Sequence, residues 1–244
     1  MVLPPFREVN HEIKLIDETK RFNYRLPKCP DILRQQLVDK INRYSEAGWW
    51  KPTTTAQAIP MICTFKITTE PKLRTVFDLR QQNENTVKDV TPFPDQDCIR
   101  TDVAKVPYRS KLDLTEAYKQ VRVVTQDVPK TAFATIFGTY ESLVMQQGDC
   151  NAPSTFQRLM TRIFIKQVGK FVHVYLDDVF IYSNSLEEHE RHLGEVFEVL
   201  RRANLFLSAS KFDVYSESMD CLGHIIDNQG IHADESKMQC VQDW

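Results

Sequence analysis

Two adjacent aspartates, Asp177 and Asp178, separate two short apolar runs, 171–176 and 179–182. Both runs are rich in aromatic and β-branched residues, which predicts that the pair lies where the chain turns between two buried strands. Two like charges in such surroundings are costly. A divalent cation such as Mg²⁺ removes the cost, because hard cations take oxygen ligands. An ordinary Asp-rich turn exposed to water is the alternative.

A third carboxylate, Asp113, lies in a similar short apolar segment, with Tyr118 five residues after it. This residue favours the metal site over the exposed turn. The two segments resemble motifs A and C of reverse transcriptases, the second being the Tyr-x-Asp-Asp hairpin of that family, and in particular those of gypsy-type LTR retrotransposons. The resemblance covers essentially the whole chain. It includes three further stretches, which are Leu3-Pro4-Pro5, Gln147-Gly148 with 151–157, and 222–226.

Alternating strands and helices, with a hairpin that bears the carboxylates, predict an α+β fold in which helices cover one face of an antiparallel sheet. The resemblance implies the fingers and palm of a right-hand polymerase core. We expect fingers with an N-terminal arm at 1–88, palm at 89–119, fingers at 120–150, palm at 151–229 and a stub at 230–244. Because the chain stops about where the family's thumb begins, the thumb, connection and RNase H are expected to be absent.

The resemblance implies an RNA-directed DNA polymerase that adds deoxynucleotides to a primer 3′-hydroxyl on an RNA or DNA template. Asp113, Asp177 and Asp178 are then the catalytic residues and the ligands of two Mg²⁺ ions, with Mn²⁺ as a substitute. Two such ions roughly 3.5–4 Å apart stabilise the attacking and the leaving oxygens. The expected partners are a primer–template, deoxynucleoside triphosphates and other segments of a retrotransposon polyprotein.

The resemblance also implies residues that bind the incoming nucleotide and the primer end. Lys66 and Arg74 match the fingers residues that clamp the nucleotide, and such cations suit phosphate oxygens. Solvated charge is the alternative for both. Tyr118 matches the steric gate that excludes a 2′-hydroxyl, with a core position as its alternative. The remaining contacts are Gln147 and Gly148 for the nucleotide, and Leu222, Gly223 and His224 for a primer grip.

Composition limits the class of protein. The net charge of -2 is unusual for a polynucleotide binder, and Asp149 adds negative charge near the expected triphosphate pocket. Six cysteines without a Cys-x-x-Cys pair favour a reducing compartment over a zinc site or a disulfide framework. His189 and His192 have a metal-like spacing but no evident third ligand, so a solvated helix flank is expected. Without an apolar run near the roughly 18 residues of a membrane span, or a signal peptide, we expect an intracellular protein in cytoplasm or nucleus.

Two other functions stay open. The first is a domesticated, non-catalytic module that keeps the fold to bind nucleic acid or protein. The missing thumb, the net negative charge and Asp149 favour this module, whereas the intact carboxylates and gate favour the polymerase. The second is a palm-type nucleotidyl cyclase, which fits two-metal chemistry but does not explain the fingers-like hairpin or the primer-grip motif.

Local patterns predict the elements that position these residues. Asp31 is expected to cap a helix that ends at Gly48, and Trp49 and Trp50 then lie in the core or stack on a template base. The other expected elements are a hairpin of 59–67 with 72–79, two strands within 130–145, a helix opened by Asn151, a helix from the capping box of Ser185 and Glu188 to Asn204, and a last hairpin that pairs 211–215 with 220–226.

Overall fold

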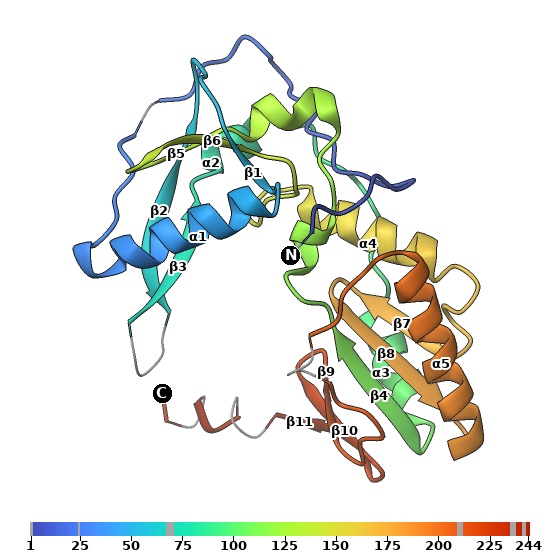
Figure 1. The fold of residues 1–244 in the computed structure, drawn as a ribbon. Coiled ribbons are helices and arrows are strands. Elements are labelled where there is room, and N and C mark those ends of the chain that lie inside the picture. The colour runs from blue at the N-terminus through green and yellow to red at the C-terminus, as the bar shows by residue number, and fades with distance from the viewer. Residues whose placement is uncertain (1, 24, 67–70, 209–211, 235–237, 241–242) are drawn as a thin grey trace. The chain divides into compact units, whose positions relative to one another are not determined.

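The computed structural model describes residues 2–23, 25–66, 71–208, 212–234, 238–240 and 243–244 (Figure 1). The chain folds into two compact units, each made of two segments of the sequence. Unit 1 comprises residues 1–90 and 116–155, and unit 2 comprises residues 91–115 and 156–244.

Unit 1 is built on a five-stranded sheet with the order β1-β6-β5-β2-β3. Its strands are β1 (Trp50–Pro52), β2 (Ile59–Lys66), β3 (Lys72–Phe77), β5 (Phe133–Thr135) and β6 (Gly138–Ser142). The predicted hairpin is confirmed as β2 and β3, which pair antiparallel from Met61 opposite Phe77 to Lys66 opposite Lys72. The turn of this hairpin is expected at residues 68–71, and residues 67–70 lie outside the part of the chain that the structure describes. The two strands predicted within 130–145 are confirmed as β5 and β6.

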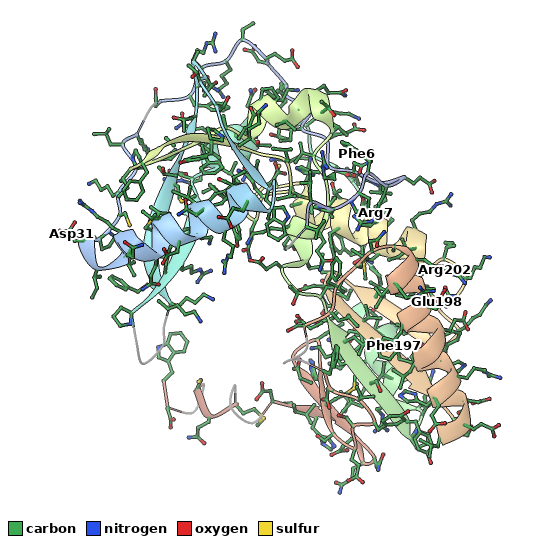
Figure 2. All side chains as sticks on the ribbon, in the orientation of Figure 1. Phe6, Arg7, Asp31, Phe197, Glu198 and Arg202 are labelled. Carbon is green, nitrogen blue, oxygen red and sulfur yellow. The ribbon has the colours of Figure 1, made fainter. Side chains whose placement is uncertain are left out.

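One helix and two tryptophans contribute to the core of unit 1, together with apolar residues of its strands. A 3₁₀ turn, η1 (Asp31–Leu33), leads into α1 (Arg34–Glu46). The predicted cap was wrong: Asp31 accepts no backbone hydrogen bond at a cap position and instead pairs with Arg34 at 2.8 Å (Figure 2). The core position predicted for the tryptophans is confirmed. Trp50 is 4 % exposed and meets the ring of Tyr44 edge-on, at 4.7 Å between centroids.

Short elements and the N-terminal arm complete unit 1. The short helices are α2 (Arg80–Glu84), η2 (Ala117–Gln120) and η3 (Thr125–Thr131). The arm is held by its backbone, since the N–H of His11 donates to the carbonyl of Arg122 at 2.8 Å. The guanidinium of Arg7, which Figure 2 labels beside Phe6, donates to the carbonyl of Gln120 at 2.6 Å. The arm is therefore an integral part of unit 1.

Unit 2 contains a three-stranded antiparallel sheet with the order β4-β8-β7. Its strands are β4 (Tyr108–Asp113), β7 (Val172–Tyr175) and β8 (Asp178–Ser183), and its helices are α3 (Gln96–Ala104), the end of α4 (Ala152–Ile163) and α5 (Leu186–Arg202). The predicted cap of α5 is confirmed, because Ser185 accepts from the N–H of Glu188 at 3.2 Å. On the solvent side of α5, Arg202 pairs with Glu198 at 2.7 Å (Figure 2).

Helices lie on both faces of this sheet, where one face was expected. Phe180 and Tyr182 of β8 pack with Ile99 and other residues of α3. Ser183 points the other way, because successive side chains of a strand alternate, and it hydrogen-bonds His189 of α5. α3 and α5 therefore cover opposite faces of the sheet.

A second small sheet of unit 2 corrects the predicted last hairpin. β9 (Met219–Cys221) pairs with β10 (His224–Asp227), and β10 pairs with β11 (Gly230–Ala233). The segment expected to pair with 220–226 was wrongly placed, since Asp213 bridges to Lys111 of β4 instead. The first turn of the sheet is Leu222-Gly223, with φ of 50° and 80°, which matches the twist of a tight hairpin.

No helix in the described ranges is both long and apolar enough to cross a membrane.

Candidate active site

The three predicted aspartates of unit 2 come together at one end of the sheet. Asp113 ends β4 and lies directly opposite Asp178, the first residue of β8. Asp177 precedes it in a two-residue turn between β7 and β8, where Leu176 has a φ of 53°. This turn brings adjacent aspartates to one place, although a regular strand sends neighbouring side chains to opposite faces.

A buried glutamine that the sequence reasoning did not assign holds this turn. The side-chain carbonyl of Gln157 on α4 accepts from the N–H of Leu176 at 2.8 Å, and its amide donates to the carbonyl of Val174 at 3.1 Å. Gln157 is 1 % exposed, beside the fully buried Phe156. An uncharged polar residue among the apolar residues of a helix was the signal that could have identified it, since buried amides need partners.

A lysine also missed by the sequence reasoning lies against these carboxylates. The amine of Lys111 is 3.3 Å from an oxygen of Asp178 and 3.1 Å from an oxygen of Asp220 on β9. Burial raises the pKa of Asp178; Lys111 opposes this rise, whereas the charges of Asp177 and Asp113 add to it. Burial lowers the pKa of Lys111, but its two carboxylate partners outweigh burial and raise it overall. The aspartates are therefore close enough to repel one another, and Lys111 compensates part of that charge.

Four of the five predicted nucleotide residues line one cavity of unit 1, with a volume of about 530 Å³. They are Lys66, Arg74, Gln147 and Gly148. Lys66 and Arg74 come from paired strands, β2 and β3, and both are exposed. Tyr118, in η2, is not among the described residues that line the cavity.

The residues that line this cavity include Gly148 but not its neighbour Asp149. Gly148 has a φ of 102°, and a Cβ there would lie 3.4 Å from Leu79, so a side chain at this position is strained. Asp149, expected to place negative charge near the triphosphate, does not line the cavity. It is 5 % exposed, and its carboxylate lies 3.3 Å from His11 and accepts from the N–H of Asn151 at 2.8 Å.

The predicted primer-grip residues occupy the turn between β9 and β10. Leu222 and Gly223 both have positive φ, and His224 begins β10. The carbonyl of Leu222 accepts from Arg100 of α3 at 3.3 Å, which ties this turn to the rest of unit 2. Within the described part of the chain, Nδ1 of His224 is buried without a hydrogen-bond partner.

The solvated flank expected for His189 was wrong. His189 is fully buried between Ser110, at 2.7 Å from Nε2, and Ser183, at 2.9 Å from Nδ1. Ser183 also lies 2.7 Å from Nδ1 of His192, whose ring stacks on Phe171. Burial lowers the pKa of His189 to about 4. The pair therefore joins α5 to the sheet through serine hydroxyls.

Comparisons with known proteins agree with these features. Residues 65–226 match the family described as Reverse transcriptase (RNA-dependent DNA polymerase). The chain is 38% identical over 170 residues to the Retrovirus-related Pol polyprotein from transposon 297 of Drosophila melanogaster, covering 70% of this chain and 16% of the polyprotein. It is 34% identical over 174 residues to that from transposon gypsy of the same organism, covering 71% and 17%. The chain thus spans about a sixth of the length of these relatives.

Solved structures show the fold. The foamy viral protease-reverse transcriptase in complex with RNA/DNA hybrid superposes with a TM-score of 0.82 at 20% identity, over 98% of this chain and 33% of that one. The same protein in complex with dsDNA gives 0.83 at 20% identity, over 97% and 50%. The fold is the fingers and palm core of a polymerase, and the chain belongs to the reverse transcriptase family, as a reverse transcriptase of the gypsy type.

Proposed function

We propose that this chain is the core of an RNA-directed DNA polymerase, which adds deoxynucleotides to a primer 3′-hydroxyl on an RNA or DNA template. The observation that carries the proposal is the register of β4 with β8, which sets Asp113 opposite Asp178, the residue that follows Asp177 in the chain. Three carboxylates at one sheet end are expensive without a cation, and they are the hard donors that phosphoryl transfer uses.

The donor set fits divalent cations. The three aspartates offer only oxygen, and the raised pKa of Asp178 reflects burial and the neighbouring charges of Asp177 and Asp113. As they stand, the described residues include no group of three His, Cys, Asp or Glu side chains already gathered around a metal position. We assign Asp113, Asp177 and Asp178 to hold Mg²⁺ or Mn²⁺. The chemistry that such ions supply when bound is stabilisation of negative charge on the attacking and leaving oxygens.

We assign unit 1 to the fingers and unit 2 to the palm. What supports this assignment is that the boundaries of the units, after residues 90, 115 and 155, fall within five residues of the predicted boundaries after 88, 119 and 150. We further propose that other segments of a polyprotein work with this core. We expect it to act inside the cell, in cytoplasm or nucleus, in keeping with six cysteines that form no disulfide.

The remaining site residues receive roles in binding. Lys66 and Arg74 hold the triphosphate of the incoming nucleotide, because Arg bonds phosphate oxygens bidentately and Lys acts as a point charge. The exposed Gln147 orients the nucleotide, beside Gly148, whose φ of 102° favours glycine at this position. Tyr118 acts as the gate against a 2′-hydroxyl. The turn formed by Leu222, Gly223 and His224 holds the primer end.

Primer extension on an RNA template, with and without Mg²⁺, tests the proposal. Asp113→Asn and Asp177→Asn remove a ligand charge but keep the shape, so extension should fall by several orders of magnitude. The melting temperature should hold or rise, because repulsion between the carboxylates is relieved. Asp39→Asn, at an exposed position of α1, makes the same charge change and should leave extension intact.

Two results would contradict the proposal. Extension by Asp177→Asn at the rate of the parent chain would show that this carboxylate holds no catalytic metal. Absence of extension by the parent chain, with tight binding of primer–template, would favour the non-catalytic binding module.

A further inference from the structure

The cavity of unit 1 carries more positive charge than the two predicted clamp residues supply. Among the described residues that line it are four cationic side chains and one carboxylate. The cations are Lys40 of α1, Lys66, Arg74 and Lys119 of η2, and the carboxylate is Glu116. The formal charge of the lining is thus four positive less one negative, a net excess of three, which is complementary to a polyphosphate.

Glu116 holds one of the additional cations at the cavity wall. The amine of Lys119 donates to Glu116 at 2.5 Å and to the hydroxyl of Tyr44 at 2.6 Å, and that hydroxyl donates to Glu116 at 2.7 Å. Lys119 also lies over the ring of Tyr44, 4.7 Å from its centroid. Glu116 has a φ of 43°, a left-handed conformation that few residues other than glycine adopt. The carboxylate therefore stands where an external anion would meet Lys119.

Lys40 lies in the same cavity without a counter-ion of its own. Its amine donates to the hydroxyl of Thr75 on β3 at 2.6 Å, and in the described ranges it makes no ion pair. Burial first, and then the charge of Lys119, lower its pKa to about 8 against the opposing charge of Glu116. The titratable groups around its amine are Glu116 and Lys119 at η2, Lys66 of β2, and Arg43 and Tyr44 of α1. An anion in the cavity would relieve this repulsion.

We propose that Lys40 and Lys119 bind linear polyphosphate in this cavity, and that Glu116 occupies the position of the anion when none is bound. The inference rests on the proposed function for its natural ligand, which would be the triphosphate group of the nucleotide that a polymerase binds. A volume of about 530 Å³ falls within the range of ligand pockets. Binding replaces an internal carboxylate by an external anion, so the affinity depends on the charge at Glu116.

Titration calorimetry of the full chain with inorganic tripolyphosphate tests the proposal without any primer. Lys40→Met and Lys119→Met should each weaken binding about tenfold, because each removes a charge-assisted contact. Glu116→Gln should tighten binding by a similar factor. Lys51→Met is the matched control: Lys51 belongs to unit 1 but not to the described lining, and the affinity should not change.

A protonation readout separates binding from a merely structural role. With a pKa of about 8, the amine of Lys40 should gain up to about half a proton from the buffer when an anion binds at pH 8. Calorimetry in buffers of different ionisation enthalpy measures this uptake, which should be smaller in Lys40→Met than in the parent chain by about that amount. The uptake itself is measured on the parent chain, and the comparison with Lys40→Met assigns it to Lys40. Binding without proton uptake, or equal affinity in Lys40→Met and the parent, would overturn the proposal.

Failure of this inference is distinct from failure of the proposed function. If primers are extended but the affinity for tripolyphosphate does not change in Lys40→Met and Lys119→Met, the polymerase assignment stands and the polyphosphate site is wrong. If no extension occurs but tripolyphosphate binds with the expected dependence, the polyphosphate site stands and the catalytic assignment is wrong.

Discussion

The side chain of Gln157 joins both sides of the turn that carries Asp177. Its carbonyl oxygen lies 2.8 Å from the backbone nitrogen of Leu176, and its amide nitrogen lies 3.1 Å from the carbonyl oxygen of Val174. Leu176 has a φ of 53°, a conformation that costs a residue with a side chain about 1–2 kcal/mol. The glutamine therefore supplies hydrogen bonds that hold a strained turn, and it makes α4 the element that positions the carboxylates.

The first prediction concerns this glutamine. Gln157→Leu keeps a comparable volume but leaves the N–H of Leu176 and the carbonyl of Val174 without their partner. We expect unfolding to become easier by about 1–3 kcal/mol. We expect kcat for primer extension to fall about 100-fold, as for a small misplacement of catalytic groups, with a small change in KM. Steady-state kinetics and urea denaturation measure the two effects.

A second glutamine provides the control for this prediction. Gln167 is 5 % exposed, also lies in unit 2, and donates to Glu195 at 2.6 Å. Gln167→Leu should lower the stability by a similar amount while kcat stays near that of the parent. Equal losses of kcat in the two variants would mean that Gln157 acts through stability alone.

The second prediction concerns Lys111 and the removal of metal. Lys111→Met removes the amine between Asp178 and Asp220, whose side chains are 22% and 52% exposed. Without a divalent cation, the variant should lose about 1 kcal/mol of stability, because the half-buried charge of Asp178 is left uncompensated while the exposed Asp220 stays solvated. Mg²⁺ should then stabilise the variant more than it stabilises the parent chain. Urea denaturation measures the free energy of unfolding of the parent chain and of the variant, each in EDTA and in Mg²⁺.

Lys105→Met serves as the reference, since Lys105 forms an exposed pair with Asp102 on α3 and should contribute about 0–1 kcal/mol. Its response to Mg²⁺ should match that of the parent chain. If Mg²⁺ stabilises Lys111→Met no more than Lys105→Met, then Lys111 is not the group that compensates the aspartates.

The third prediction concerns Tyr118, which is half-buried in η2. If it acts as the gate, Tyr118→Val opens space beside the sugar. Ribonucleotides should then be incorporated more readily relative to deoxynucleotides. The ratio of kcat/KM for the two substrates is the measurement, because discrimination is a difference of transition-state binding. Tyr140→Val, at a half-buried tyrosine of β6, should leave the ratio unchanged. An unaltered ratio in an active Tyr118→Val chain would show that Tyr118 has a packing role and is not the gate.

The sequence predicted elements whose signals are local, and it failed where distant segments decide. The hairpin of β2 and β3 follows from alternating residues, and the cap of α5 follows from Ser185 and Glu188. The place of Asp213 beside Lys111 could not be predicted in this way, because its partner lies 102 residues away in the sequence. The failed cap at Asp31 has a local cause instead, since Arg34, three residues later, pairs with its carboxylate.

The candidate site shows the same division. Three aspartates stand out in the sequence because apolar runs surround them, and the pairing of β4 with β8 then brings them together. The signal of Gln157 indicates burial without indicating its partner, and Lys111 and Lys40 have no such local signal. Their importance depends on partners 19, 67 and 35 residues away, namely Leu176, Asp178 and Thr75. Only the folded chain specifies these partners.

The last prediction concerns the dependence of stability on pH. His189 is fully buried, and burial followed by the charge of His192 lowers its pKa from 6.5 to about 4. Between these values the unfolded chain binds more protons than the folded chain, so stability falls as the pH falls from 6.5 towards 4. This histidine alone should cost about 2 kcal/mol between pH 7 and pH 5. His189→Asn, which keeps a polar group near Ser110 and Ser183, should flatten that part of the profile. His232→Gln, at an exposed position on β11, should leave the slope as in the parent. Urea denaturation at pH 7 and pH 5 measures the change in the free energy of unfolding. An unchanged pH dependence in His189→Asn would assign the acid sensitivity to other groups.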